Sequence, residues 1–303
     1  MDEPPPASGD EHQCHRIALQ RCSRLLLNRR QGLVDDQKLW DEALGAVQLC
    51  EDLWPPADFA PKLVLVDASK GFYSLVIHSI GEKLRHLNLG RTYCDDEIVV
   101  AVARVCPNLQ TMILEENSLV SDTAISELAT RCPNLRFVKL RNAIRVGDEA
   151  ISDLVKNCAE LAFLGISYTR CGDDTMYAIM QYAEKLHTLY LNDLGVTEAA
   201  LCELLRKRGA QFDTLGMASL DVVSERVIHE IAQSCPNLRR LDLSACEEGD
   251  MTEDLVDMLV LRLPRLEALV VAGIDEISDE YIVRLAEKVS VEQFWLAPPP
   301  ELT

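Results

Sequence analysis

The sequence repeats one short phrase, Cys-Pro-Asn-Leu, at three places that lie in step with one another. The copies are VCPNL at 105–109, RCPNL at 131–135 and SCPNL at 234–238. When segments are aligned on the leucine that ends this phrase, the chain from Leu84 onward divides into units of 25 to 28 residues. A fixed period of this length predicts a solenoid, in which each unit buries its apolar side chains only by stacking on its neighbours.

Each unit opens with leucines in the pattern L-x-x-L-x-L or a close variant of it. In an extended chain alternate side chains face opposite ways, so the last two apolar positions of each line face one side and the residues flanking them face the other. This is the pattern of a leucine-rich repeat, and it predicts an α/β solenoid with a curved parallel sheet on its concave side. The lines are LRHLNL (84–89), LQTMIL (109–114), LRFVKL (135–140), LAFLGI (161–166), LHTLYL (186–191), FDTLGM (212–217), LRRLDL (238–243), LEALVV (266–271) and a partial VEQFWL (291–296).

The second half of each unit has the pattern of a short amphipathic helix, which we expect on the convex side. A polar turn such as SDTAI (121–125) leads into apolar residues spaced three and four apart, as in AISELATRC (124–132). An acidic residue in the first turn is favoured by the helix dipole, and proline ends the helix. Cys-Pro-Asn-Leu therefore marks the place where a helix ends and the next strand begins. The expected N-caps are Ser121, Thr197, Ser224, Thr252 and Ser278.

The cysteines follow the repeat. Cys106, Cys132 and Cys158 lie 26 residues apart, and Cys235 returns three periods later. Equal spacing puts these thiols at equivalent places in successive coils, whereas zinc ligands must converge on one point. The 11 cysteines are an odd number, and no signal peptide accompanies them. We therefore expect reduced, buried thiols, with no disulfide framework and no metal site.

Charge and composition narrow the class of protein. The formal net charge is −19, so a wide phosphate-binding surface would have to form against the field of the whole molecule, and we expect no nucleic acid partner. No stretch approaches the roughly 20 apolar residues of a membrane span. The opening MDEPPPASGDEHQ lacks the basic and apolar segments of a signal peptide. We expect a cytoplasmic or nuclear protein.

The repeat also resembles a known family. Strand, cysteine-containing corner, Ser/Thr-Asp turn, helix and Cys-Pro-Asn-Leu together are similar to the cysteine-containing subtype of leucine-rich repeat, found in F-box substrate receptors of cullin-type ubiquitin ligases. The resemblance covers about Leu84 to Leu296. It implies a protein-binding solenoid and, where an F-box is present, docking to a Skp-type adaptor and cullin.

The amino-terminal part departs from that family. An F-box typically opens near a Leu-Pro pair, which this region lacks, although LVDDQKLWDEAL (33–44) has a similar mix of Leu, Trp and acid. A plain capping helix predicts the same mix. A short helical cap followed directly by repeats is more similar to F-box-lacking relatives of the antagonist-of-mitotic-exit-network type. We expect an acidic, Pro-rich tail at 1–13, a helical cap at 14–60, the solenoid at 61–297 and a carboxyl-terminal tail at 298–303.

The sequence contains none of the usual catalytic motifs. Phosphate-binding, dinucleotide-binding, zinc-protease and nucleophile-elbow patterns are absent, and the six histidines are scattered. We therefore predict a protein that is not an enzyme and that holds no cofactor.

Solvent-facing strand positions give the candidate binding surface. Ile113, Phe137, Phe163 and Tyr190 are expected to be exposed in neighbouring coils, although a neighbouring loop could cover them. Charged side chains are expected to rim them, and Gly165 and Gly216 either leave room for a partner or serve tight packing. The full set of expected contact residues is Ile113, Glu115, Phe137, Lys139, Arg141, Phe163, Tyr190, Arg240, Asp242 and Trp295.

These residues suggest a protein partner bound on the concave face. The cluster of Arg136, Lys139, Arg141 and Arg145 favours an acidic or phosphorylated segment. The leading hypothesis is a substrate receptor or adaptor in SCF-type ubiquitin-dependent regulation. The alternative is a permanent scaffold subunit of a ciliary, ribosomal or organellar complex, for which an acidic, motif-free repeat is equally suited.

Overall fold

The protein folds into a curved stack of coils, each made of one strand and one helix. The structure is a computed structural model that describes residues 62–64, 81–246, 251–274, 277–286 and 290–291. All strands are parallel and lie in sequence order in one ten-stranded sheet. The strands are β1 Lys62–Val64, β2 His86–Asn88, β3 Thr111–Ile113, β4 Phe137–Lys139, β5 Phe163–Gly165, β6 Thr188–Tyr190, β7 Thr214–Gly216, β8 Arg240–Asp242, β9 Ala268–Val270 and β10 Ser290–Val291.

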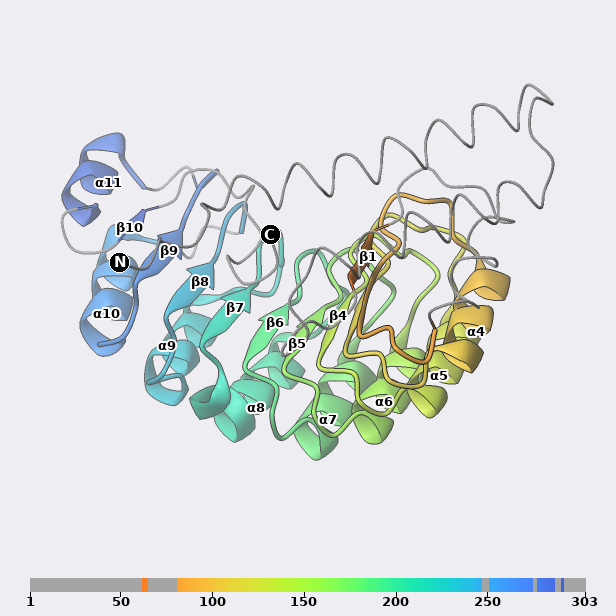
Figure 1. The fold of residues 1–303 in the computed structure, drawn as a ribbon. Coiled ribbons are helices and arrows are strands. Elements are labelled where there is room, and N and C mark those ends of the chain that lie inside the picture. The colour runs from red at the N-terminus through yellow and green to blue at the C-terminus, as the bar shows by residue number, and fades with distance from the viewer. Residues whose placement is uncertain (1–61, 65–80, 247–250, 275–276, 287–289, 292–303) are drawn as a thin grey trace, which may run out of the picture.

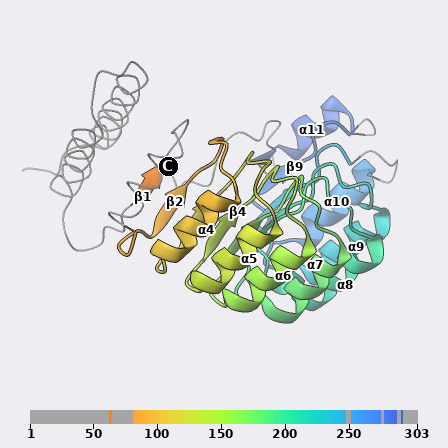
Figure 2. The same cartoon turned by 90° about the vertical axis from the view of Figure 1, so that its right-hand side faces the viewer.

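The helices form the outer layer of the stack. Figure 1 shows the strands along the inner, concave side, and Figure 2 shows the helices side by side along the convex side. This arrangement confirms the predicted α/β leucine-rich-repeat solenoid. The helices are α4 Asp96–Val105, α5 Asp122–Arg131, α6 Asp148–Asn157, α7 Asp173–Tyr182, α8 Glu198–Arg208, α9 Glu225–Ser234, α10 Glu253–Arg262 and α11 Asp279–Leu285, with a 3-10 turn η1 at Gly209–Gln211.

The strand register agrees with the leucine pattern from β2 to β9. Equivalent residues of adjacent coils pair across the sheet, as Phe137 does with Phe163. The central residue of each of these strands faces the helices and is at most 2 % exposed, because it fills the space between sheet and helix layer. The first and third strand residues therefore lie on the concave side, as the sequence predicts.

The last strand departs from the predicted register. Ser290 and Val291 of β10 pair with Ala268 and Leu269 of β9. The sequence alignment instead set Gln293 opposite Ala268, so the predicted register was wrong by three residues. The sequence of this coil, VEQFWL, keeps only the last leucine of the pattern, and the pattern that fixes the register in the other coils is too weak here. Trp295 lies outside the described residues, as do the expected tail at 1–13, the cap at 14–60 and the tail at 298–303.

A left-handed turn follows every strand from β2 to β9. The residue seven places after each opening leucine has a φ between 52° and 71°. In the turns after β2 to β8 its N–H donates to a carbonyl of the next coil, as from Asn142 to Ser167 at 2.9 Å and from Tyr168 to Asn192 at 2.9 Å. This hydrogen bond continues the sheet ladder beyond the strand and offsets the cost of positive φ in non-glycine residues. The positions are Arg91, Glu116, Asn142, Tyr168, Asp193, Ser219, Ala245 and Gly273.

The acid at the start of one helix is hydrogen-bonded to the start of the next. The carboxylate of Asp148 accepts from the N–H of Gly172 at 2.8 Å and from the N–H and hydroxyl of Thr175 at 2.9 and 2.6 Å. Asp96 accepts from the N–H and hydroxyl of Ser121 at 2.7 and 2.6 Å. We call this contact the acid staple, because it joins one coil to its successor; it is present at each step from α4 to α9 and between α10 and α11. The other acids in this role are Asp122, Asp173, Glu198 and Glu253.

The predicted N-caps all occupy the cap position, but one of them bonds differently. Thr197, Ser224, Thr252 and Ser278 accept a backbone N–H of their own helix. Ser121 makes no such bond. Its hydroxyl donates to Asp96 of the preceding coil instead. The cap positions therefore serve both the helix they begin and the contact between coils.

The repeated cysteines fill the corner behind each helix, as expected. The Sγ of Cys132 donates to the carbonyl of Cys106 at 3.3 Å, and that of Cys158 donates to the carbonyl of Cys132 at 3.6 Å. Burial raises the pKa of Cys106, Cys132, Cys158 and Cys235 to about 12. All the cysteines that the structure describes are free thiols and are buried.

We predict that removing an acid staple weakens the stack, whereas removing its exposed neighbour does not. Asp148→Ala deletes hydrogen bonds to the next coil and should lower the free energy of unfolding by about 2 kcal/mol. Glu149→Ala is the matched control, since Glu149 is exposed in the same helical turn and has the same charge. It should change stability by less than about 0.5 kcal/mol. Urea unfolding followed by circular dichroism measures both, and equal losses would contradict the staple.

We also predict that the corner cysteines do not react while the protein is folded. A thiol reacts as its thiolate, and a pKa raised to about 12 keeps Cys106 and Cys132 protonated near neutral pH. Iodoacetamide at about pH 8, close to the pKa of a free thiol, should label them only after denaturant is added. Peptide mass spectrometry of the two samples reads each cysteine separately. Rapid labelling of Cys132 in the folded protein would show that the corner is open to solvent.

Candidate protein-binding surface

Three aromatic side chains form a row on the concave side of the sheet. Phe137 and Phe163 are paired in register on β4 and β5, and their ring centroids lie 3.8 Å apart with an interplanar angle of 17°. The ring of Tyr190, on β6, is tilted against Phe163 with the centroids 5.4 Å apart. Phe163 and Tyr190 are absent from the cluster of buried side chains that forms the described core. We call Phe137, Phe163 and Tyr190 the aromatic row.

The exposure of this row differs from the sequence expectation. Phe163 is 6 % exposed and Tyr190 is 8 % exposed, so the prediction that both rings face open solvent was wrong. The reason is lateral packing, since strands about 4.8 Å apart bring rings of successive coils into face contact. Phe137 and Ile113 are partly exposed. Phe137 on β4 is therefore the accessible ring of the row, with Ile113 of β3 as its neighbour in the sheet.

Gly216 makes room for the ring of Tyr190. A Cβ atom built at Gly216 would lie 2.2 Å from Cδ1 and 2.8 Å from Cε1 of Tyr190, which is too close for any contact. The tyrosine therefore lies over the glycine, and the space above the backbone is filled from within the chain. At Gly165 the nearest atoms are Cγ of Lys139 at 3.2 Å and Cε1 of Phe163 at 3.4 Å. Of the two roles considered for these glycines, tight packing is the one observed.

Charged residues border the row at the β3–β4 end. Lys139 and Glu115 form an ion pair of 2.9 Å. Arg141 is exposed, with its guanidinium 5.5 Å from the ring centroid of Tyr168. Among the residues that the structure describes, Arg141 has no carboxylate partner. The cation–π contact holds this guanidinium in place while its hydrogen-bond donors stay free.

The predicted basic cluster is split by its hydrogen bonds. Arg136 lies 3.5 Å from a carboxylate oxygen of Glu160. Arg145 points to the backbone carbonyl of Leu119, with 3.5 Å between Nη1 and the oxygen. Arg141 is therefore the cation of this group that stands next to the aromatic row without an acidic neighbour in the described structure.

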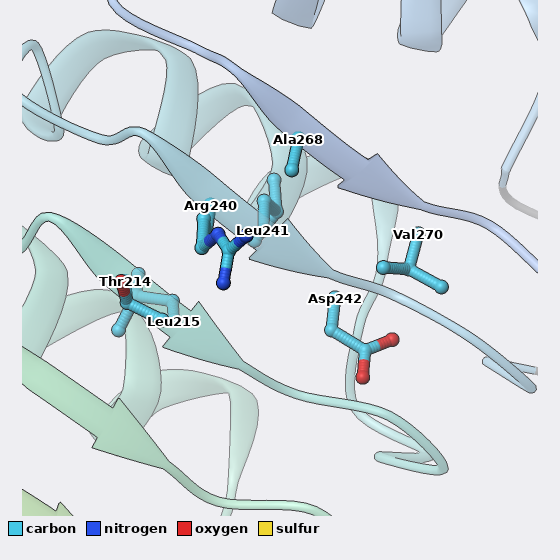
Figure 3. A pocket seen from close by; sticks show the side chains of 7 residues that line it. All are labelled: Thr214, Leu215, Arg240, Leu241, Asp242, Ala268 and Val270. Carbon is cyan, nitrogen blue, oxygen red and sulfur yellow. The ribbon is translucent and has the colours of Figure 1, made fainter. Parts of the chain in front are cut away.

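Arg240 and Asp242 lie on β8, two strands away from the end of the row at β6. Asp242 is 4 % exposed, and its Oδ1 accepts from the N–H and hydroxyl of Ser244 at 3.0 and 2.6 Å. Both side chains line a hollow of about 10 Å³ with Thr214 and Val270 (Figure 3). A hollow of this size has room for about one water molecule. The predicted contact residues therefore form two groups, and the structure does not bring Arg240 and Asp242 to the aromatic row.

Tyr168 is the site residue that the strand pattern missed. It lies beyond β5, in the left-handed turn with a φ of 59°. The alternation of inward-facing and outward-facing residues ends with the strand, so it does not predict where the side chains of the turn point. An alignment of the turns themselves could have found it, because Asn142 and Tyr168 occupy equivalent places in coils whose strands carry Phe137 and Phe163.

The described residues were compared with the requirements of a metal site and of a membrane span. Their groups of His, Cys, Asp and Glu include none of three or more that could hold a metal ion. None of the helices they form is both long and apolar enough to cross a membrane.

Comparison with known proteins gives a weak likeness in structure alone. No family model matches the sequence, and no curated protein matches it. A crystal structure of the yeast Rad7 and Elc1 complex is similar over 96 % of this chain and 99 % of that chain, with 16 % identity and a TM-score of 0.40. An internalin (inlF) from Listeria monocytogenes is similar over 78 % of this chain and 72 % of that chain, with 14 % identity and a TM-score of 0.40. Because these scores are low, the solenoid architecture rests on the strand order, register and packing described above.

We predict that Gly216→Ala displaces Tyr190 and loosens the aromatic row. The new methyl group overlaps the ring, so the free energy of unfolding should fall by about 1 to 3 kcal/mol. Gly195→Ala is the control, because nothing lies within 4 Å of a Cβ there, and it should change stability by less than about 1 kcal/mol.

A double-mutant cycle tests the cause. In a Tyr190→Ala background the ring is gone, so Gly216→Ala should then cost much less. An undiminished cost in that background would show that Tyr190 is not what the new methyl group meets.

Proposed function

We propose that this protein is a protein-binding module whose concave surface at the β3–β4 end, around Phe137 and Arg141, contacts the partner. The observation that carries the proposal is the aromatic row, which lies on the concave side of the sheet and outside the core. Folding of a leucine-rich repeat needs the apolar strand centres, and it does not need aromatic rings on the opposite side.

Stacking makes this surface suitable for binding. The ring of Phe137 is supported on one side by Phe163, which in turn packs against Tyr190. A ring that is already held in place loses little conformational entropy on binding. Aromatic and arginine side chains with this degree of support are the residue types that dominate measured binding energy in protein interfaces.

The charge of the surface favours an acidic or phosphorylated segment of the partner. Lys139 is paired with Glu115, whereas Arg141 is held only by the ring of Tyr168. An arginine fixed in orientation can bind a carboxylate or a phosphate with two parallel hydrogen bonds. The molecule as a whole is strongly acidic, so this local positive charge would set the orientation of the partner.

A role as substrate receptor or adaptor in SCF-type ubiquitin-dependent regulation follows from the resemblance to cysteine-containing repeats. The thiols of Cys106, Cys132 and Cys158 at equivalent corners support that subtype. The segment that would dock a Skp-type adaptor and cullin, 14–60, lies outside the described residues. We propose a cytoplasmic or nuclear location for this role.

A permanent scaffold subunit is the second candidate. The observation that favours it is the set of acid staples, which ties the coils from α4 to α9 to one another, and α10 to α11, and stiffens the stack. Affinity purification of the tagged full chain separates the two roles. A receptor should bring down a Skp-type adaptor or cullin and exchange between small and large complexes on size-exclusion chromatography. A scaffold subunit should remain in one large complex without them.

We predict that Phe137→Ala removes the contact with the partner and leaves the fold intact. Phe137 is partly exposed and its truncation opens the end of the stacked row, so recovery of the bound protein should fall at least about tenfold. Arg141→Glu should have a similar effect through charge repulsion. Quantitative mass spectrometry of affinity-purified complexes measures both.

Tyr177→Ala is the matched control for this experiment. Tyr177 is an aromatic residue on the convex helix α7 and is 45 % exposed, so its removal should leave partner recovery unchanged. Unchanged recovery with Phe137→Ala as well would show that the partner does not use the concave surface.

A further inference from the structure

Three large apolar side chains are exposed on the turns that lead from strand to helix in successive coils. Tyr93 is 83 % exposed, Ile144 is 51 % exposed and Leu119 is 49 % exposed. Tyr93 lies between β2 and α4, Leu119 lies between β3 and α5, and Ile144 lies between β4 and α6. These turns form one edge of the solenoid, apart from the concave strand positions that carry the aromatic row.

Backbone pairing holds these turns side by side. Leu119 pairs with Asp95, Arg145 pairs with Ser121 and Arg170 pairs with Gly147 in isolated parallel bridges.

Side chains continue this contact along the edge. The guanidinium of Arg145 lies 3.5 Å from the carbonyl oxygen of Leu119, and that of Arg170 donates to the carbonyl of Arg145 at 2.8 Å. Apolar and basic side chains of four successive coils therefore form one continuous strip. We call Tyr93, Leu119, Ile144, Arg145 and Arg170 the rim surface.

The fold does not require apolar side chains here. The turn position of Tyr93 and Ile144 is taken by Gly195 and Asp221 in later coils, and it is exposed in all four. In those later coils the preceding leucine, Leu220 for example, is buried and completes the corner. Exposed leucine, isoleucine and tyrosine side chains gathered in the early coils therefore need an explanation other than core packing.

Two arginines add cationic hydrogen-bond donors to the rim surface of an acidic molecule. Arg145 has no carboxylate partner among the described residues. Arg170 lies 3.9 Å from a carboxylate oxygen of Asp122, but that carboxylate also accepts the N–H of Gly147 at 2.6 Å. Both guanidinium groups are oriented by backbone carbonyls, which do not neutralise them. An acidic group that approaches this edge therefore finds oriented donors beside apolar contact area.

We propose that the rim surface binds a short acidic segment of a partner protein that also carries apolar side chains. Its apolar side chains pack on Leu119, Ile144 and Tyr93, and its carboxylates pair with Arg145 and Arg170. Coils about 4.8 Å apart give the strip a length of roughly 15 Å, which an extended segment of roughly five residues spans. A basic segment would meet the guanidinium of Arg145, which has no carboxylate partner among the described residues, so this charge selects against it.

A displayed library of random 12-residue peptides tests this proposal with the intact full chain. Wild-type protein should enrich peptides in which Asp or Glu alternates with Leu, Ile, Phe or Trp. The double variant Leu119→Ser, Ile144→Ser should lose that enrichment, and the dissociation constant of a selected peptide should rise at least about tenfold. Arg145→Ser should weaken the same peptide and reduce the salt dependence of its binding.

Two controls separate the rim from other surfaces. Leu261→Ser removes a leucine that is 81 % exposed on α10, so it should leave the enrichment unchanged. Phe137→Ala changes only the concave surface, so it should also leave peptide binding at the rim unchanged. The rim double variant and Phe137→Ala therefore show separately whether the rim proposal or the concave-surface proposal is wrong. Urea unfolding confirms that each variant folds.

The outcomes decide the proposal. A photoreactive leucine in the selected peptide should crosslink to the turns at 117–121 or 142–147. The proposal is overturned by any of three results: no enrichment of acidic and apolar peptides, equal enrichment by the double variant, or crosslinks confined to the strands or the carboxyl-terminal helices.

Discussion

The structure depends on one constraint, which is that the strand of each coil satisfies its backbone N–H and C=O groups only by pairing with the adjacent coils. Strands of three residues have no hydrogen bonds of their own, and the left-handed turn after each strand donates to the following turn. The acid staple adds a charged hydrogen bond at the opposite end of the turn, as between Asp148 and Gly172. Since the turn contact recurs between all adjacent coils from β2 to β9 and the staple between most of them, the register is fixed there, and each side chain meets its equivalents in the neighbouring coils.

That fixed register determines what the surface can do. Aromatic rings at equivalent strand positions must stack, which is why Phe163 is covered while Phe137 at the end of the row keeps an accessible side. The same register aligns the strand-to-helix turns, so an exposed leucine in one coil lies beside an exposed isoleucine in the next. The two surfaces proposed to bind partners thus arise from single side chains in successive coils, and the repeat tolerates Gly195 or Asp221 at the position of Tyr93 and Ile144.

Much of this could be predicted from the sequence, and the rest could not for definite physical reasons. The period and the leucines give the register of β2 to β9, because burial of one face admits a single alignment. The exposure of Phe163 and Tyr190 was predicted wrongly. The alternation pattern gives the side of the sheet that a residue faces, whereas exposure also depends on packing against the side chains of neighbouring coils. The staple was foreseen only as a favourable helix charge at Asp148, because its acceptor role needs the distance to Gly172. The register of β10 was predicted wrongly because its coil keeps too little of the leucine pattern to define the alignment.

The acidity of the protein bears on specificity as well as on packing. Asp96, Asp122, Asp148 and Asp173 are hydrogen-bonded to the next coil, and the molecule carries a formal net charge of −19. An acidic partner is repelled at long range and attracted only where Arg141, Arg145 or Arg170 is within reach. Charge alone therefore cannot hold such a partner. The proposed partner must also bury apolar side chains against Phe137 or Ile144. A polyanion that carries charge without apolar surface lacks this second contact and should bind weakly.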